Sequence, residues 1–263
     1  MFGNARLRSH ARFFLARRRG YLTYFGEKLR FPADTFLVRQ ACEQGIYEQA
    51  NLGLLQKAVR PSTWVFDIGA NIGLMSAPLL REHSSVHVVS VEPSPSTREF
   101  LSVSARSSQN HRRWHVVAEA LGEAPGTVEF HASPDGGGAY DGIRNTGRAG
   151  KGVGARVPMT TLDELWGRFG RPPVSALKID TEGAESLVLR GSRACLEACR
   201  PFILLEWNPV NLEAHGLAPE SLADLAGGLG YRIHTAPFLV PVISRADLPL
   251  LCRLNETFVL LPE

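Results

Sequence analysis

Short apolar runs alternate with amphipathic segments from about residue 63 to the end of the chain. A short apolar run bounded by turn-forming residues is typical of a buried strand, and a 3.6-residue apolar period is typical of a helix. Strands are expected at residues 64–68, 86–91, 115–118, 127–131, 175–179, 202–206, from 231 and at 257–261. Helices are expected at residues 71–82, 95–108, from about 184 and at 219–229. The alternation predicts an α/β fold, with a mostly parallel sheet and helices on both faces.

The first 60 residues follow a different pattern. Residues 1–20 have apolar positions at helical spacing between many arginines, which predicts a basic helix. Residues 21–32 resemble two short strands around a tight turn, and residues 34–59 are expected to be helical. The chain therefore divides into an N-terminal helix, hairpin and cap segment, residues 1–60, and a main domain, residues 61–263.

The composition is that of a globular protein, and its charge is unevenly distributed. With 44% hydrophobic and 21% charged residues, disorder, collagen-like repetition and a disulfide scaffold are excluded. Residues 1–30 hold eight basic residues and one acid, Glu27, so their net charge is +7. Because the whole chain has a net charge of +3, residues 31–263 have a net charge of −4. The basic segment has several open interpretations: it docks a partner, a membrane surface or the second subunit of a homo-oligomer, or it only keeps the chain soluble.

Sequence features relevant to location favour the cytoplasm. No run of 18 apolar residues occurs, so we expect no transmembrane segment. The N-terminus lacks the apolar stretch of a secretory signal, although its arginines also resemble an organellar transit peptide. The cysteines form no CxxC pair and have no nearby histidine to complete a zinc site. Reduced thiols fit a cytoplasmic protein. The cysteines are Cys42, Cys195, Cys199 and Cys252.

Glycines and an acid follow the first strand of the main domain, in the segment Asp67-Ile-Gly-Ala-Asn-Ile-Gly73. Ligands of open parallel sheets bind beyond the carboxyl ends of the strands, and glycines let the backbone approach them closely. A dinucleotide fingerprint would also need glycines at the positions of Asn71 and Leu74. Their absence disfavours pyrophosphate binding and an NAD-dependent oxidoreductase. A tight turn without a ligand is the alternative.

Glu92 follows the second strand, 25 residues after Asp67. A carboxylate there accepts two hydrogen bonds from the vicinal hydroxyls of a ribose. Asp67 would repel phosphate and attract an ammonium group. The loop and the two acids together predict a ligand with a nucleoside and a positive end but no phosphate, and S-adenosylmethionine is such a ligand.

Several segments of the chain resemble the serial motifs of FkbM-type methyltransferases. They are Val65-Phe-Asp-Ile-Gly-Ala-Asn-Ile-Gly73, Val91-Glu-Pro-Ser-Pro95, Ala120-Leu-Gly122, Thr161-Leu-Asp-Glu-Leu165 and Leu177-Lys-Ile-Asp-Thr-Glu-Gly-Ala-Glu185. The resemblance runs from about Gly45 to Glu206, and its last segment is the specific part. Thr181 stands where valine is usual, and Pro78 lies in a helix that ordinarily lacks proline. The resemblance implies a Rossmann-like class I methyltransferase with a seven-stranded, mostly parallel sheet whose last strand is antiparallel.

The resemblance also implies site residues. The implied cofactor-binding residues are Glu48, Asp67, Gly69, Ala70, Asn71, Gly73, Glu92, Glu119, Ala120 and Asp180. The loop after the first strand would hold the methionine part of S-adenosylmethionine, Glu92 the ribose, and Glu119 with Ala120 would border the adenine. Asp180 would lie near the sulfonium and the incoming acceptor.

Asp180 is the candidate catalytic residue. Methyl transfer needs the nucleophile and the methyl group to be aligned, and an alcohol must also lose its proton. Asp180 is expected to act as the general base, and the alternative is that it only anchors the cofactor or caps a helix. We expect no metal; the alternative is Mg²⁺ or Ca²⁺ held by Asp180, Glu206 and Asn208. Glu182 and Glu185 are expected in the first turn of a helix.

Residues 133–154 are rich in glycine. A long irregular segment in a compact domain is typical of a functional lid or of a mobile loop. As a lid it would close over the substrate, and its arginines would favour an anionic acceptor. The candidate substrate-binding residues are Tyr140, Arg144, Glu206 and Asn208. His131 and His234 fall at strand ends and are candidate bases or structural histidines.

The function expected from these residues is S-adenosylmethionine-dependent O-methylation of a small-molecule hydroxyl, on a sugar or a secondary metabolite. One alternative is an RNA methyltransferase whose basic N-terminus binds phosphates. The segment lacks a recognised RNA-binding fold and interleaved aromatic residues, so nucleic acid is not the expected partner. The other alternative is a non-catalytic scaffold, against which the intact Asp67, Glu92 and Asp180 argue.

Overall fold

The main sheet occupies the centre of the computed structural model, which describes residues 2–32, 35–132, 138–146 and 153–263. Its strands are β3 Trp64–Ile68, β4 His87–Val91, β5 Trp114–Val117, β9 Val174–Ile179, β10 Phe202–Glu206, β11 Tyr231–Thr235, β12 Val240–Pro241 and β13 Thr257–Pro262. In the described part of the chain these eight strands follow the order β12-β11-β13-β10-β9-β3-β4-β5. The strand order therefore reverses between β3 and β9, where an open sheet of this kind binds its ligand.

The strand directions confirm the expected sheet. β5, β4, β3, β9 and β10 pair in parallel, and β13 pairs antiparallel with both β10 and β11. The sheet has one strand more than expected, because β12 pairs with β11 at the edge. A two-residue strand is too short to show an apolar period, so the sequence pattern did not reveal it.

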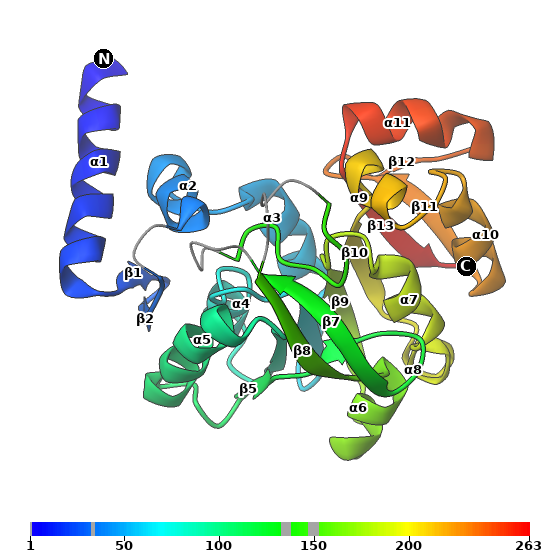
Figure 1. Cartoon of the computed structure of the whole chain (residues 1–263), viewed down its shortest axis with the longest axis horizontal. Helices are drawn as coiled ribbons and strands as arrows, with labels where there is room; N and C mark the ends of the chain where they lie inside the picture. Colours follow the sequence, from blue (N-terminus) through cyan, green and yellow to red (C-terminus); the bar gives the residue numbers. More distant parts are fainter. Residues whose placement is uncertain (1, 33–34, 133–137, 147–152) are drawn as a thin grey trace.

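Helices cover both faces of this sheet (Figure 1). Successive strand residues point to opposite faces, so Val65 and Phe66 belong to different cores. Val65 packs with the face covered by α3 Gln49–Ala58, α4 Ser76–Glu82 and α5 Pro95–Ser107. Phe66 packs with the face covered by α6 Leu162–Arg168, α7 Glu185–Arg190, α8 Arg193–Cys199, α10 Ser221–Gly228 and α11 Leu248–Leu254. The prediction of two covered faces is confirmed.

Pro78 explains where α4 begins. The helix expected over 71–82 starts only at Ser76, and residues 71–75 form turns. Pro78 therefore lies in the first turn, where a backbone N–H has no partner within the helix, so the missing donor costs nothing. Because α4 begins only at Ser76, residues 69–75 form a loop between the end of β3 and this helix.

A small second sheet lies in front of part of the main sheet in the view of Figure 1. It consists of β6 Ala120–Leu121, β7 Gly126–Ala132 and β8 Val153–Thr160 in the order β6-β8-β7, around a core of Ala120, Phe130 and Val157. The strand expected at 127–131 belongs to this sheet. The segment expected as a lid, 133–154, joins β7 to β8, and 133–137 and 147–152 lie outside the described residues.

The N-terminal residues form α1 Phe2–Arg19, the hairpin β1 Leu22–Tyr24 and β2 Glu27–Leu29, and α2 Phe36–Gln44. Figure 1 shows α1 at the edge of the molecule, away from the main sheet. The helix expected over 34–59 is interrupted, because Gly45 and Glu48 have left-handed φ angles of 82° and 43°. Leu22 and Leu29 share a core with Val65 of the main domain. The division at residue 60 stays a prediction.

The described helices include none that is both long and apolar enough to cross a membrane.

Candidate active site

A cavity of about 260 Å³ lies at the carboxyl ends of β3, β4, β9 and β10. Its lining includes the loop after β3, the start of the β4–α5 loop, the end of β9, the α2–α3 junction and the start of β13. The polar lining residues include Tyr47, Glu48, Asn51, Asn71, Glu92, Tyr140, Asp141, Lys178, Asp180, Thr181, Glu182, Glu206, Glu256 and Thr257. The cavity is where the topology of a parallel sheet places a ligand.

The glycine loop touches the end of the neighbouring strand. Gly69 has φ 76°, and a Cβ built on it would lie 1.7 Å from the backbone oxygen of Asp180. Only glycine fits both the backbone angle and the contact. Asn71, with φ 49°, donates from Nδ2 to the backbone oxygen of Gly138 at 2.9 Å. Gly69, Ala70 and Asn71 all line the cavity, as the sequence of the loop predicts.

Glu92 is a buried acceptor at the end of β4. One carboxylate oxygen accepts from the backbone N–H of Asn71 at 2.8 Å and the other from that of Ser94 at 2.9 Å. Burial, helped by the charge of nearby Asp141, raises the pKa of Glu92 to about 7 despite the two backbone N–H groups, which lower it. Each carboxylate oxygen keeps a lone pair for a ligand hydroxyl.

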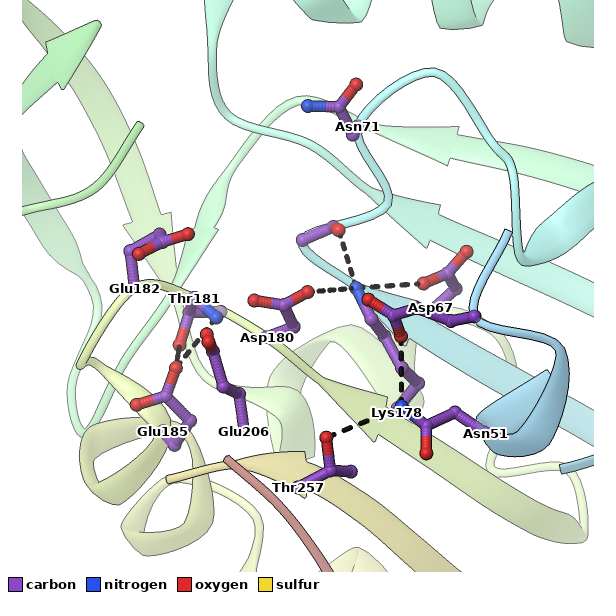
Figure 2. Close-up of polar contacts among 12 residues, drawn as sticks. Asn51, Asp67, Asn71, Lys178, Asp180, Thr181, Glu182, Glu185, Glu206 and Thr257 are labelled. Carbon is purple, nitrogen blue, oxygen red and sulfur yellow. Dashed lines mark hydrogen bonds and ion pairs between the residues drawn. The ribbon is translucent and has the colours of Figure 1, made fainter. Parts of the chain in front are cut away.

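Lys178 joins the ends of β3 and β9 (Figure 2). Its Nζ donates to the backbone oxygen of Gly69 at 2.8 Å and lies 3.1 Å from Asp180 Oδ2 and 3.7 Å from Asp67 Oδ1. Burial by itself lowers the pKa of Lys178, but Asp180 and Asp67 raise it above the usual value for lysine. The ammonium is therefore charged, and it fixes the loop relative to Asp180.

Asp67 lies behind the cavity wall rather than in it. It is fully buried, and its Oδ2 accepts from Ser76 Oγ at 2.5 Å. Burial raises its pKa, and Lys178 and Ser76 oppose that shift. Asp67 faces the cavity only through Lys178, so its contact with the methionine part of a cofactor stays a prediction that this placement does not support.

Asp180, Glu182 and Glu206 place carboxylate oxygens within 4.8 Å of one another. Burial raises the pKa of Glu206 well above its usual value, and the charge of Asp180 raises it further. The nearby Asn211 donates from Nδ2 to Glu182 at 2.9 Å. Because like charges this close cannot all ionise freely, the group retains a proton or attracts a cation.

Glu185 holds the backbone that carries this group. Its Oε1 accepts from the backbone N–H of Thr181 at 2.8 Å and from that of Gly183 at 3.1 Å. Burial raises the pKa of Glu185 to about 7. As expected, Glu185 opens α7, whereas Glu182 precedes the helix with φ 54° and lines the cavity.

The cavity brings together most of the residues expected there. Among its described lining are Glu48, Gly69, Ala70, Asn71, Glu92, Ala120, Tyr140, Asp180 and Glu206. Outside that lining lie Asp67, Gly73, Glu119, Arg144 and Asn208. Gly73 packs on Trp114, Glu119 pairs with Arg168 at 2.5 Å, and Arg144 is exposed.

Asn208 instead caps α9 Pro209–Ala214. Its side chain accepts from the backbone N–H of Val210 and donates to Glu256, both at 2.8 Å. The carboxylates close enough for a metal are Asp180, Glu182 and Glu206. The placement of Asn208 therefore does not support the alternative in which Asp180, Glu206 and Asn208 bind a metal ion.

Some lining residues were not expected from the sequence. Lys178 had a readable signal, because it is the charged residue of the buried strand β9. Tyr47 lies beside the expected Glu48, but its side chain carried no signal of its own. Glu256 and Thr257 reach the cavity only because β13 lies next to β10, and nothing in their local sequence indicates that.

The sheet order and the cavity at the strand ends define a Rossmann-like class I methyltransferase. A family model described as the methyltransferase FkbM domain matches residues 67–233. This chain belongs to the FkbM methyltransferase family.

Solved structures similar to this chain are distant relatives. A methyltransferase FkbM from Methylobacillus flagellatus is 16% identical, with a TM-score of 0.48 over 97% of this chain and 59% of that one. This chain thus spans less than two thirds of that relative. The magnesium protoporphyrin IX methyltransferase of Synechocystis, solved with bound S-adenosylmethionine, is 10% identical, with a TM-score of 0.45 over 86% of this chain and 82% of that one. No curated protein matches the chain.

Proposed function

We propose that this methyltransferase transfers a methyl group to a hydroxyl of a small molecule, a sugar or a secondary metabolite. The observation that supports the proposal is that two carboxylates with different expected roles line the same cavity. Glu92, an acceptor suited to a ribose, and Asp180, a carboxylate beside a second carboxylate, both line it. That arrangement fits a nucleoside-bearing methyl donor and a proton-bearing nucleophile in the same space.

The residues present fit S-adenosylmethionine. When bound, it supplies a methyl group activated on a sulfonium. Glu92 would hold the ribose through the lone pairs that Asn71 and Ser94 leave free. The backbone of Gly69 and Ala70 would border the methionine part, because both residues line the cavity at the end of β3. Glu48, which lines the same cavity, would reach its charged end.

Asp180 is proposed as the residue that takes the proton. As the acceptor oxygen bonds to the methyl carbon, its O–H bond breaks and the proton passes to a carboxylate oxygen of Asp180. Glu206, within 4.8 Å, shares that proton. Lys178 holds Asp180 in place from the opposite side at 3.1 Å. Tyr140 and Glu206 would contact the acceptor, since both line the cavity.

A cytoplasmic location is also proposed. Cys42, Cys195, Cys199 and Cys252 are free thiols, which suits a reducing compartment. Expression of a tagged chain followed by cell fractionation tests this proposal.

Transfer from labelled S-adenosylmethionine tests the proposed reaction. The purified chain is incubated with separate panels of sugars, glycosides, secondary-metabolite alcohols and RNA. We expect an alkali-stable methyl ether on a member of the small-molecule panels. Label on RNA would favour the nucleic-acid alternative, and failure to bind S-adenosylmethionine in calorimetry would favour the non-catalytic scaffold.

A further inference from the structure

We propose that the acceptor is a cation: it carries a protonated amine beside the hydroxyl that receives the methyl group. The inference rests on the proposed function and specifies its substrate class. It follows from the charges of the side chains that line the cavity.

The cavity is strongly acidic. Among its described lining residues, Glu92 and Asp141 are linked through Ser94 and belong to the nucleoside part. Glu48 is assigned to the charged end of the cofactor, and the remaining carboxylic acids of that lining are Asp180, Glu182, Glu206 and Glu256. They come from different parts of the chain, so a single acidic turn does not account for them.

The basic side chain of the described lining does not balance these acids. Lys178 supplies one positive charge, and its ammonium is already engaged by Gly69, Asp180 and Asp67. The cofactor adds a sulfonium, an ammonium and a carboxylate, which is a net charge of about +1. Even with Glu206 protonated, the cavity keeps negative charge that a cationic acceptor would neutralise.

A second feature of the cavity also suits an ammonium group. Tyr47 lines it within reach of the charges of Asp180 and Glu206, and aromatic rings combined with carboxylates bind ammonium groups through cation–π and charge-assisted contacts. Burial raises the pKa of Tyr47, and Glu48 and Asp180 raise it further, so its ring carries no negative charge of its own at neutral pH. Arg144, which was expected to favour an anionic acceptor, is exposed and lies outside the described lining.

Matched acceptors that differ only in charge test the inference. The chain and labelled S-adenosylmethionine are incubated with methyl glucosaminide and 2-deoxystreptamine, with the N-acetylated form of each, and with methyl glucuronide. We expect label in at least one amine, with a preference of about tenfold or more over its N-acetylated form. Label in no amine, or equal label in neutral or anionic members, would overturn the inference.

Glu182→Gln removes one negative charge of the cavity and leaves Asp180, the proposed proton acceptor, in place. The glutamine can still accept from Asn211, which donates to Glu182 at 2.9 Å. We expect KM for the amine to rise about tenfold with little change in kcat, and KM for S-adenosylmethionine to stay the same. Glu213→Gln, on the exposed surface of α9, is the matched control and should change neither. An unchanged KM for the amine in Glu182→Gln contradicts the inference.

Two further measurements distinguish a wrong proposed function, a wrong acceptor charge and a bound metal ion from one another. Calorimetry of S-adenosylmethionine binding reports on the proposed function: if the cofactor binds while no charge preference appears, only the cationic acceptor is wrong. An excess of chelator tests whether the three carboxylates bind a metal ion instead of an ammonium group. If the chelator abolishes transfer to the amines, Asp180, Glu182 and Glu206 hold a metal and the inference is overturned. We expect transfer to be unaffected by the chelator.

Discussion

Lys178 Nζ lies 3.1 Å from Asp180 Oδ2, and the same ammonium donates to the backbone oxygen of Gly69 at 2.8 Å. One buried cation therefore connects the glycine loop at the end of β3 with the candidate catalytic residue at the end of β9 (Figure 2). Asp67 completes this contact from behind, at 3.7 Å. Lys178 is therefore a positioning residue, because it holds the glycine loop and the Asp180 carboxylate in fixed places relative to each other.

Lys178→Met should destabilise the protein and weaken cofactor binding. The substitution removes the counter-charge of the fully buried Asp67, and an uncompensated buried charge costs about 3–5 kcal/mol. Urea denaturation measures the free energy of unfolding. The double variant Lys178→Met with Asp67→Asn should recover part of the loss, because it removes the stranded charge. An unchanged denaturation midpoint in the single variant would show that the ion pair does not stabilise the site.

Asp180→Asn should lower kcat by about 10²–10⁴-fold, since the amide cannot take the acceptor proton. The dissociation constant of S-adenosylmethionine, measured by calorimetry, should change much less. Asp247→Asn, at an exposed position away from the cavity, is the control and should keep full activity. Normal turnover in Asp180→Asn would remove Asp180 from the proposed proton transfer.

Cofactor affinity should rise with pH through the titration of Glu92. Burial raises the pKa of this carboxyl to about 7, so below pH 7 it is protonated and loses an acceptor site for the ribose. We expect the affinity to increase about tenfold from pH 6 to pH 8 and then level off. Calorimetry over this range measures it. Glu92→Gln should bind more weakly with a flat pH profile, and a profile equal to that of the unchanged protein would refute the assignment.

The stability of the cofactor-free protein should depend on the same carboxyl with the opposite sign. Its folded pKa of about 7 exceeds the ordinary value of 4.5, so the folded state binds the proton more tightly than the unfolded state. The stabilisation is complete below about pH 4.5 and is lost as the pH rises through 7, to a total of about 3 kcal/mol. Comparing urea denaturation of the unchanged protein and Glu92→Gln at pH 5 and 8 isolates this contribution. We expect the difference in stability between the two proteins to change with pH.

Gly69→Ala should unfold the loop or abolish cofactor binding. The added methyl would lie 1.7 Å from the backbone oxygen of Asp180, at a φ of 76°. Strain of this kind costs more than about 1 kcal/mol and displaces the loop. Gly53→Ala is the control, because Gly53 lies inside α3 with open space around it. That substitution should stabilise the protein by about 0.5–1 kcal/mol. Thermal unfolding and calorimetry of both variants measure the contrast.

The local sequence pattern was sufficient to predict an element where that element is a buried apolar run. β3, β4, β9 and β10 lie within a residue or so of the positions expected, because each is a short apolar run bounded by turns. β12 and the break between α2 and α3 did not show in the pattern. A two-residue edge strand has no period, and the break depends on left-handed angles at Gly45 and Glu48.

The sequence by itself determined the alternation of strands and helices, and with it the edge of the sheet where Gly69, Glu92 and Asp180 had to gather. Those statements follow from periodicity and from the rule for parallel sheets, which need no knowledge of neighbours. Only the tertiary structure decided that Asp67 stands behind Lys178, and that Glu182 and Glu256 line the same cavity as Asp180. Side-chain contacts between residues far apart in the chain depend on strand order and burial, and no local pattern encodes either.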